Sequence, residues 1–382
     1  MRVLITTTGG AGHFGPLVPF AEAIGHAGGE VLVATRASTA VPILAHGYEV
    51  ATFADAPAEE RDAVFGAARE LPIDDANVRV VADVFARIDA RAAVPGVLAA
   101  CESFRPDVIV HEVCEFAGAL VGAHTGVPVV SVGIGLAALE RLVMPAAEAA
   151  LDDVRGELGL DAGESAAYFT LTPPLLEDPA APGPPGAQRF RERDDRATGR
   201  LPDWWDGADG PLVYLTFGSV APQLDFFPGL YQAAIDALAP LPVRVLVTTG
   251  RDRDPADLGP LPPNVEIHTW IPHLVVLEHV SVFVTQGGTG SLMEAFYQGV
   301  PVVVAPQQTD QLAIARQVEA LGLGRSLGTG DLDAPALRAA VEAVAADGET
   351  RRRAAAMRDS LRTAPGPAGV ADRIESLMSG TA

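Results

Sequence analysis

The chain has 382 residues, 48% of them hydrophobic, and its 49 acidic side chains against 27 lysines and arginines give a formal net charge of −22. This length and apolarity predict two folded domains rather than a disordered chain, and so acidic a surface argues against general nucleic-acid binding. No apolar run approaches the roughly 20 residues of a membrane helix, and no signal peptide is visible. We therefore expect a cytoplasmic protein without stable membrane association, in which Cys101 and Cys114 lie in apolar surroundings as reduced, inert thiols.

Short β-branched segments alternate with Ala- and Leu-rich segments in the first half of the chain, which indicates parallel α/β structure. The predicted strands are Arg2–Thr7, Val31–Thr35, Val50–Phe53, Val108–His111 and Val127–Val132. The predicted helices are Leu17–Gly25, Thr39–Ala45, Val78–Phe104 with Pro95 as a candidate break, Phe116–His124 and Ala146–Leu158.

The periodic pattern stops in a proline-rich, charged segment and then restarts. The second set of predicted strands is Leu212–Phe217, Val243–Thr248, Val265–His268, Val282–Thr285 and Val300–Ala305, with helices at Tyr231–Leu238, Leu292–Tyr297, Gln311–Ala320 and Ala334–Ala346. We expect two doubly wound domains, residues 1–178 and 211–364, joined by a linker over 179–210, with a helix in 365–382 that packs back on the first domain. Ligands of such sheets bind beyond the carboxyl ends of the strands, so the active site is expected in a cleft between the domains.

A glycine loop, Gly10–Gly15, follows the first predicted strand and fits the dinucleotide fingerprint G-x-G-x-x-G. With Arg36 as a partner for a 2′-phosphate, it would indicate an NADP-dependent oxidoreductase. Two features argue against this interpretation: the loop carries an imidazole where a pyrophosphate should approach, and Pro16 and Pro19 make a rigid entry to the next helix. A tight turn without any ligand is the plainer alternative.

His13 in this loop is the best candidate for a general base, because an imidazole accepts protons near neutral pH. Such a base works best with a carboxylate behind it. Glu112 follows a predicted strand and should lie at its carboxyl end, whereas Asp107 precedes that strand and should lie at the wrong end. Glu115 is the second choice, and a turn histidine with an unrelated capping carboxylate is the structural alternative.

A second glycine-rich turn comprises Gln286, Gly287, Gly288, Thr289, Gly290 and Ser291. It lies between the predicted strand Val282–Thr285 and a predicted helix. Such a turn exposes backbone N–H groups at the positive end of the helix dipole, which favours phosphate binding. The second domain is therefore expected to bind a nucleotide or a nucleotide sugar.

Together these residues resemble the GT-B-fold inverting glycosyltransferases that act on small molecules, especially the actinobacterial antibiotic glycosyltransferases of enediyne and polyketide pathways. The resemblance spans nearly the whole chain. It depends on the His13 loop, Val213–Ser219, Trp270-Ile271-Pro272, the glycine turn ending in Ser291 with Glu294, and Asp310-Gln311. It implies a GT-B fold of two Rossmann-like domains facing a central cleft, the first binding the acceptor and the second the nucleotide sugar.

The resemblance also implies a role for each matching residue. Trp270 and the backbone of Ile271 would hold the base, and Glu294 would accept a hydrogen bond from a ribose hydroxyl. Gly218 and Ser219 would bind the diphosphate with the turn at Gln286–Ser291, while Asp310 and Gln311 would bind the sugar. As structural alternatives, Trp270 could be a core residue and Asp310 a helix cap.

Two positions depart from the family pattern. Gln286 stands where most relatives have a histidine, and its amide donates hydrogen bonds but cannot become charged. His273 stands where relatives usually have glutamine, near the expected base site. Gln286 also leaves open a third hypothesis, a catalytically impaired protein that assists a true glycosyltransferase.

The implied activity is inverting transfer of a sugar, favoured as a deoxysugar, from dTDP or UDP to a hydroxyl of a hydrophobic natural product. His13 and Glu112 would be catalytic, and the nucleotide sugar is a co-substrate, so no cofactor is expected. No metal is expected either, because Asp252 and Asp254 lie in a polar loop and are interpreted as solvated charges. Homodimer formation is left open.

Overall fold

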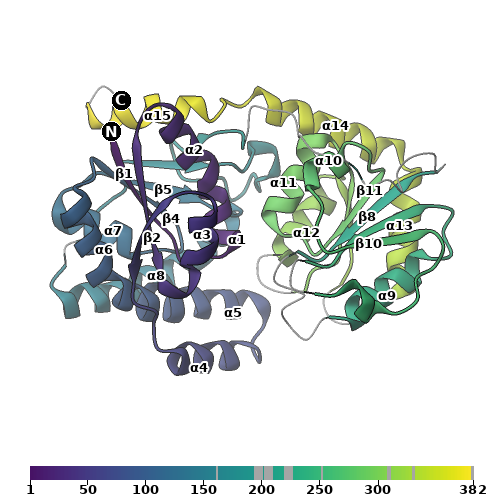
Figure 1. Cartoon of the computed structure of the whole chain (residues 1–382), viewed down its shortest axis with the longest axis horizontal. Coiled ribbons are helices and arrows are strands. Elements are labelled where there is room, and N and C mark those ends of the chain that lie inside the picture. The colour runs from purple at the N-terminus through teal and green to yellow at the C-terminus, as the bar shows by residue number, and fades with distance from the viewer. Residues whose placement is uncertain are drawn as a thin grey trace. The chain divides into compact units, whose positions relative to one another are not determined.

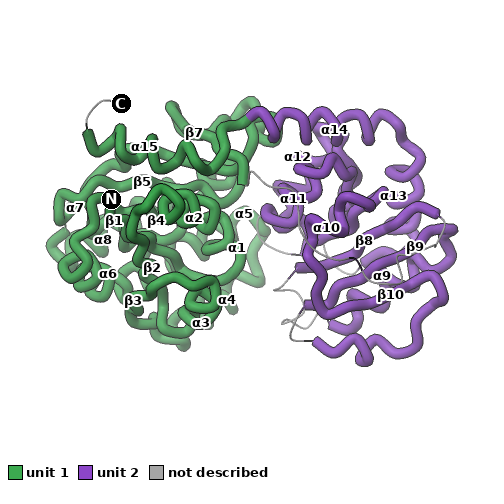
Figure 2. The backbone as a smooth tube through the Cα atoms, turned by 45° about the horizontal axis from the view of Figure 1, so that its top comes forward, with its two compact units in different colours: residues 1–194, 364–382 green, residues 195–363 purple. Residues whose placement is uncertain are grey.

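In the computed structural model the chain forms two compact units, one of Met1–Asp194 with Ala364–Ala382 and one of Asp195–Thr363 (Figure 2). The structure describes residues 1–160, 162–192, 201, 210–218, 227–250, 253–307, 311–328 and 332–379. Among these described residues, no helix combines the length and the apolarity needed to cross a membrane.

The first unit is built on a seven-stranded parallel sheet in the order β3-β2-β1-β4-β5-β6-β7 (Figure 1). Its strands are β1 Arg2–Thr6, β2 Glu30–Arg36, β3 Glu49–Phe53, β4 Val108–Glu112, β5 Val129–Gly133, β6 Ala167–Thr170 and β7 Gln188–Arg189. The direction of winding reverses between β1 and β4. A reversal of this kind opens a crevice at the carboxyl ends of the two strands, which is where ligands bind in doubly wound sheets.

Helices cover both faces of this sheet. They are α1 Ala11–Phe14, η1 Gly15–Leu17, α2 Val18–His26, η2 Ala37–Thr39, α3 Ala40–Ala45, α4 Ala58–Ala68, α5 Ile73–Arg79, the π-helix η3 Val80–Asp89, α6 Ala90–Phe104, α7 Ala117–Thr125, α8 Ala137–Leu158, η4 Pro174–Leu176 and α15 Ala368–Met378. Because strand side chains alternate between faces, Val3 and Ile5 pack with α2 and α15 while Leu4 packs with α6 and α7. Val370 and Ile374 of α15 are fully buried in the α2 cluster, so this helix returns to the first unit.

The second unit has a six-stranded parallel sheet in the order β10-β9-β8-β11-β12-β13. Its strands are β8 Leu212–Thr216, β9 Arg244–Thr248, β10 Val265–His268, β11 Val282–Thr285, β12 Val302–Val304 and β13 Gly324–Ser326. Its helices are α9 Gly229–Leu238, η7 Pro255–Leu258, α10 His273–Leu277, α11 Thr289–Gln298, α12 Gln311–Ala320, α13 Ala334–Ala346 and α14 Gly348–Thr363. Here the winding reverses between β8 and β11.

The predicted α/β class with two doubly wound sheets is confirmed, while several details were wrong. Pro95 does not break its helix, since α6 continues through it to Phe104. The helix predicted from Ala146 begins at Ala137, where the carboxylate of Glu177 accepts a hydrogen bond from the first N–H at 3.0 Å. Gln188–Arg189, which the sequence places in the linker, pair with β6 as β7.

Candidate active site

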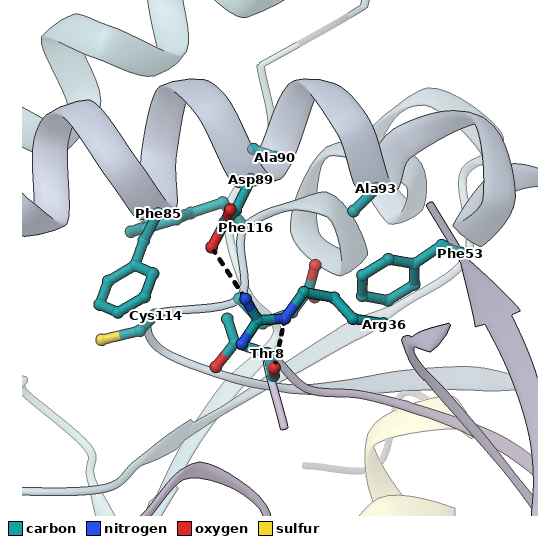
Figure 3. Close-up of a pocket in the computed structure, with 10 residues that line it drawn as sticks. Thr8, Arg36, Phe53, Phe85, Asp89, Ala90, Ala93, Cys114 and Phe116 are labelled. Carbon is teal, nitrogen blue, oxygen red and sulfur yellow. Dashed lines mark hydrogen bonds and ion pairs between the residues drawn. The ribbon is translucent and has the colours of Figure 1, made fainter. Parts of the chain in front are cut away.

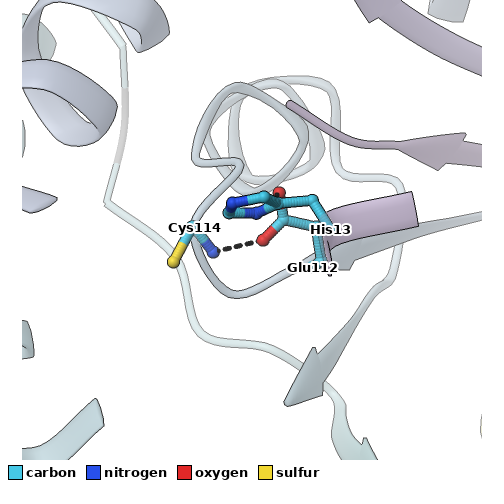
Figure 4. A group of neighbouring side chains, drawn as sticks. All are labelled: His13, Glu112 and Cys114. Atoms are coloured by element: carbon cyan, nitrogen blue, oxygen red, sulfur yellow. Dashed lines mark hydrogen bonds and ion pairs between the residues drawn. The ribbon is translucent and has the colours of Figure 1, made fainter. Parts of the chain in front are cut away.

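His13, the predicted general base, lies in α1 directly after β1. Gly9 and Gly10 precede it with φ angles of +82° and +85°, which other residues rarely adopt, so the tight turn into α1 depends on them. The imidazole Nδ1 of His13 lies 3.1 Å from Oε1 of Glu112, the last residue of β4 (Figure 4). Since β1 and β4 are neighbours at the reversal of the sheet, the two side chains meet where a ligand is expected.

Glu112 is fully buried and is surrounded by hydrogen-bond donors. Its Oε1 accepts from the backbone N–H and the hydroxyl of Thr8 at 3.2 and 3.0 Å, and its Oε2 accepts from the N–H of Cys114 at 2.7 Å. Burial alone would raise the pKa of Glu112, but His13 and these donors hold that pKa below its ordinary value. The carboxylate is therefore ionised and only accepts, so Nδ1 of His13 carries the hydrogen and Nε2 keeps its lone pair.

Two residues that sequence reasoning did not place here complete the surroundings of His13. The ring of Phe85, from η3, meets the imidazole edge-on, with 5.5 Å between the ring centroids. A ring nitrogen of His13, a carboxylate oxygen of Glu112 and the Sγ of Cys114, which are the atoms that could bind a metal ion, all lie within 4.8 Å of one another (Figure 4). The prediction of apolar surroundings for Cys114 was wrong, because the turn after β4 brings it beside the charged pair. Imidazole, carboxylate and thiolate also suit Zn²⁺, so metal independence stays a prediction.

Glu115, the second choice as partner of His13, has a structural role. Its Oε1 accepts from the N–H of Ala117 and its Oε2 from the N–H of Gly118, both at 2.9 Å, and the hydroxyl of Thr6 donates to it as well. Both oxygens are thus used to hold the start of α7 against β1. Burial raises the pKa of Glu115 to about 7. Glu112, and not Glu115, is the carboxylate hydrogen-bonded to His13.

A small cavity adjoins this pair and shares Thr8, Phe85 and Cys114 with it (Figure 3). Arg36 and Asp89 point into the cavity, and Nε of Arg36 donates to the carbonyl of Thr8 at 2.8 Å. The guanidinium of Arg36 therefore contacts Thr8 and Asp89 within the first unit, so Arg36 no longer supports the hypothesis of an NADP site that binds a 2′-phosphate.

The residues expected to bind the donor lie in the second unit and follow the carboxyl ends of its strands. In chain order the described ones are Gly218 after β8, Trp270 and Ile271 after β10, Gln286 to Glu294 after β11, and Gln311 after β12. Parallel strands end at one edge of their sheet, so these segments emerge from the same edge. Ser219, Asp310 and Asp252 lie outside the described residues.

The glycine turn after β11 forms the N-terminus of the ten-residue helix α11. Gly287 has a φ of +97°, and Gly288 caps the helix. The hydroxyl of Ser291 donates to the carbonyl of Gly288 at 3.0 Å. The first N–H groups of an α-helix have no partner within the helix, so those of α11 are directed toward this turn. The turn has the geometry expected of a phosphate site.

The side-chain amide of Gln286 lies over Gly218 and Gly288. A Cβ placed on either glycine would stand 2.3 or 2.9 Å from Nε2 of Gln286, so only glycines admit the amide in this position. Oε1 of Gln286 accepts from the hydroxyl of Thr285 at 2.9 Å. The amide N–H₂ group therefore lies beside the glycine turn, where the family resemblance implies a donor to the diphosphate.

The residues expected around the nucleoside differ in exposure. Trp270 is 49% exposed, so the alternative that it is a core residue was wrong, whereas Ile271 is 5% exposed.

Oε2 of Glu294 lies 3.4 Å from Nδ1 of His273, and burial lowers the pKa of His273 to about 4. His273 is therefore neutral near pH 7. Oε1 of Gln311 accepts from the N–H of Gln307 at 2.8 Å.

Comparisons with known proteins identify the family of the chain. Residues 232–377 match the family described as Erythromycin biosynthesis protein CIII-like, C-terminal domain. The chain is 36% identical to demethyllactenocin mycarosyltransferase of Streptomyces fradiae over 177 residues, which are 46% of this chain and only 38% of that protein. It is 30% identical to L-demethylnoviosyl transferase of Streptomyces niveus over 380 residues, which cover 97% of both proteins. The chain belongs to the glycosyltransferases of antibiotic biosynthesis.

The fold of this glycosyltransferase has a solved counterpart. The crystal structure of CalG4, the calicheamicin glycosyltransferase, superposes with a TM-score of 0.82 at 28% identity, covering 100% of this chain and 99% of that one. The GT-B fold predicted from the sequence is thereby confirmed. An NADP-dependent oxidoreductase built on Gly10–Gly15 does not fit this family.

Proposed function

We propose that this glycosyltransferase moves a sugar from a nucleoside diphosphate to a hydroxyl of a hydrophobic natural product such as an enediyne or polyketide. A deoxysugar on dTDP is the favoured donor, and a UDP-sugar is the alternative. The observation that carries the proposal is the 3.1 Å contact between Nδ1 of His13 and the buried, ionised carboxylate of Glu112. This contact holds the imidazole in the tautomer with the hydrogen on Nδ1, so that Nε2 is the nitrogen that would take a proton.

In the proposed reaction, Nε2 of His13 takes the proton of the acceptor hydroxyl while that oxygen forms a bond to the anomeric carbon of the sugar. The bond from this carbon to the diphosphate oxygen breaks, and its electron pair leaves with the diphosphate. Attack comes from the face opposite the leaving group, so the anomeric configuration inverts. Glu112 stabilises the imidazolium that forms and holds the ring in the productive tautomer.

Charge on the leaving diphosphate would be met by fixed dipoles. The N-terminus of α11, the backbone at Gly218 and Ser219, the hydroxyl of Ser291 and the amide of Gln286 are the proposed donors. In line with the family resemblance, Trp270 and Ile271 would bind the base, Glu294 the ribose, and Asp310 with Gln311 the sugar. None of these steps requires a metal ion.

A thermal-shift panel of dTDP, UDP, GDP and NADPH tests the donor class. A ligand at about 100 times its Kd stabilises the folded state by about 2.7 kcal/mol, which gives a clear rise in Tm. dTDP is expected to give the largest shift and UDP the next largest. A shift with NADPH alone would overturn the proposal.

Transfer is tested with His13→Ala and with His26→Ala, which removes an exposed histidine of α2 as a control. The first change is expected to lower turnover by roughly 100-fold or more and to leave nucleotide binding intact, while the control stays active.

NMR of the anomeric proton in the product reports inversion or retention. Full activity in EDTA is expected, and sedimentation velocity decides whether a homodimer forms. No transfer from any dTDP- or UDP-sugar would favour the auxiliary, non-catalytic role that Gln286 leaves open.

A further inference from the structure

Asp89, the last residue of η3, carries a buried carboxylate with unused hydrogen-bonding capacity. The residue is 6% exposed, and within the part of the chain that the structure describes neither Oδ1 nor Oδ2 accepts a hydrogen bond. Nε of Arg61 lies 3.3 Å from Oδ1, and a terminal nitrogen of Arg36 lies 3.8 Å from Oδ2. These guanidinium groups balance the charge without the short, aligned contacts of a bidentate pair. Leaving a buried carboxylate in this state is costly unless a ligand or water supplies a donor.

The carboxylate of Asp89 faces the small cavity beside the His13–Glu112 pair (Figure 3). Its volume is about 10 Å³, which is room for one hydroxyl group or one water molecule but not for a ring. Phe53, Phe116 and Ala93 form buried apolar walls around the carboxylate. These walls close the cavity to solvent on their own side, so a donor can enter only from the half-buried side, either on a ligand or as a single water molecule.

The cavity is also placed to act on the same ligand as His13. Its half-buried lining residues are Arg36, Phe85 and Cys114, whereas the others are buried, so solvent reaches it from their side. Phe85 touches the ring of His13, and Cys114 lies within 4.8 Å of it. A molecule lying across Phe85 with one hydroxyl at His13 can therefore place a second polar group in the cavity.

Size and charge together define that polar group. An ammonium group is disfavoured because Arg36 and Arg61 together outweigh the single carboxylate of Asp89. A carboxylate or phosphate is excluded by its size, because the cavity admits only one hydroxyl-sized group. A neutral hydroxyl fits, since it donates to Asp89 and accepts from Arg36. A methoxy group is too large and has no hydrogen to donate.

We propose that the cavity at Asp89 and Arg36 is a specificity subsite for a second, unreacted hydroxyl of the acceptor. The glycosyltransferase therefore selects polyhydroxylated acceptors, with the apolar body of the molecule against Phe85 and the reacting hydroxyl at His13. This inference rests on the proposed function, because it names a feature of the acceptor for that same reaction.

The test measures the Kd of three ring compounds for the full chain by ligand-observed NMR. The probes are 1,3-dihydroxybenzene, 3-methoxyphenol and phenol, which differ only in the second substituent. Because a hydrogen bond to a charged group contributes roughly 1.5–3 kcal/mol, the dihydroxy compound should bind about tenfold or more tightly than the other two. Asp89→Asn removes the charge with little change of shape, and Ala93→Leu fills the cavity while keeping Asp89. Either change should reduce the advantage to less than about threefold, and Asp153→Asn at an exposed ion pair should leave it unchanged.

Equal binding of the three probes to the unaltered protein, or no binding of any of them, would overturn the subsite. An advantage that survives in Asp89→Asn or Ala93→Leu would overturn it as well, and would fit a cavity that holds only water. The comparison within the unaltered protein stands even where a variant fails to fold. Binding of dTDP and UDP is measured in the same samples: loss of hydroxyl selectivity with intact nucleotide binding sinks only the subsite, while absent nucleotide binding sinks the proposed function.

Discussion

Oε1 of Glu112 accepts hydrogen bonds from both Thr8 and His13, so a single buried oxygen fixes the loop after β1 and the imidazole at its end. The other oxygen, Oε2, accepts from the N–H of Cys114 at 2.7 Å. All of these neighbours act as donors, which is the environment of a carboxylate that stays ionised. The geometry of His13 therefore depends on Glu112 having two accepting oxygens.

Glu112→Gln should disable this arrangement while changing the side-chain volume little. In either orientation, the new amide N–H₂ points at a donor, either the N–H of Cys114 or the group at Thr8 and His13. The imidazole then loses its orientation and the charge that stabilises its protonated form, so kcat is expected to fall roughly 100-fold, with the KM for the donor unchanged. Steady-state kinetics check this, with the exposed Glu157→Gln as the matched control. A loss of less than about threefold would show that Glu112 has no part in catalysis.

Much of the fold follows from periodicity in the sequence. The predicted bounds of β10, β11, α12 and α13 agree with the structure to the residue. These segments are bounded by turn residues and have a clear period. By contrast, α4 went unpredicted because Ala58–Ala68 has only one buried residue and no apolar stripe. The short strand β7 is held by its pairing with β6, a tertiary contact that no local pattern reports.

The residues of the candidate site likewise fall into those that the sequence could predict and those that only tertiary packing brings together. His13 and Glu112 could be paired from the sequence because each comes at the carboxyl end of a predicted strand. Asp89 and Phe85 could not, since their helix lies far along the chain from β1 and only the packing of η3 brings them near His13. Cys114 was misassigned because the apolarity of the surrounding sequence does not report that the turn after β4 places its side chain beside His13 and Glu112.

Gln286→His should strengthen diphosphate binding. The glutamine amide donates hydrogen bonds beside Gly218 and Gly288 but has no charge, whereas a protonated imidazole adds one at the same edge of α11. Charge-assisted hydrogen bonds are stronger by about 1 kcal/mol, so dTDP affinity and turnover are each expected to rise about fivefold, more at pH 6 than at pH 8. Calorimetric titration and initial rates measure the effect.

The change Gln298→His, at the half-buried last residue of the same helix, serves as the control for the Gln286 prediction. It should alter neither quantity. Unchanged affinity and turnover in Gln286→His would mean that the helix N-terminus and backbone already supply all the stabilisation that the diphosphate receives.

Glu140 should make the protein less stable as the pH rises. Burial, with Glu177 nearby, raises the pKa of Glu140 to about 7 from a model-peptide value of 4.5, and the hydroxyl of Tyr168 donates to both of its oxygens at 2.7 Å. The folded state thus keeps a proton that the unfolded chain releases. The free energy of unfolding is therefore expected to drop by about 2 kcal/mol between pH 5.5 and 8 through this group. Glu140→Gln should remove that share of the slope in urea unfolding, and the exposed Glu148→Gln on the same helix should not. Equal slopes in all three proteins would mean that Glu140 ionises normally.

His273 should have the opposite effect, in a lower pH range. Burial lowers the pKa of His273 to about 4 from 6.5, so between these values the unfolded chain takes up a proton that the folded state does not. The free energy of unfolding is expected to drop by about 2 kcal/mol from pH 7 to pH 5 through this side chain. His273→Gln, which installs the residue that the family resemblance leads us to expect, should remove that loss. The matched change His46→Gln at an exposed histidine should keep it. Because Nδ1 of His273 lies 3.4 Å from Glu294, the same variant should also change dTDP affinity if Glu294 binds the ribose, and unaltered affinity would count against that role.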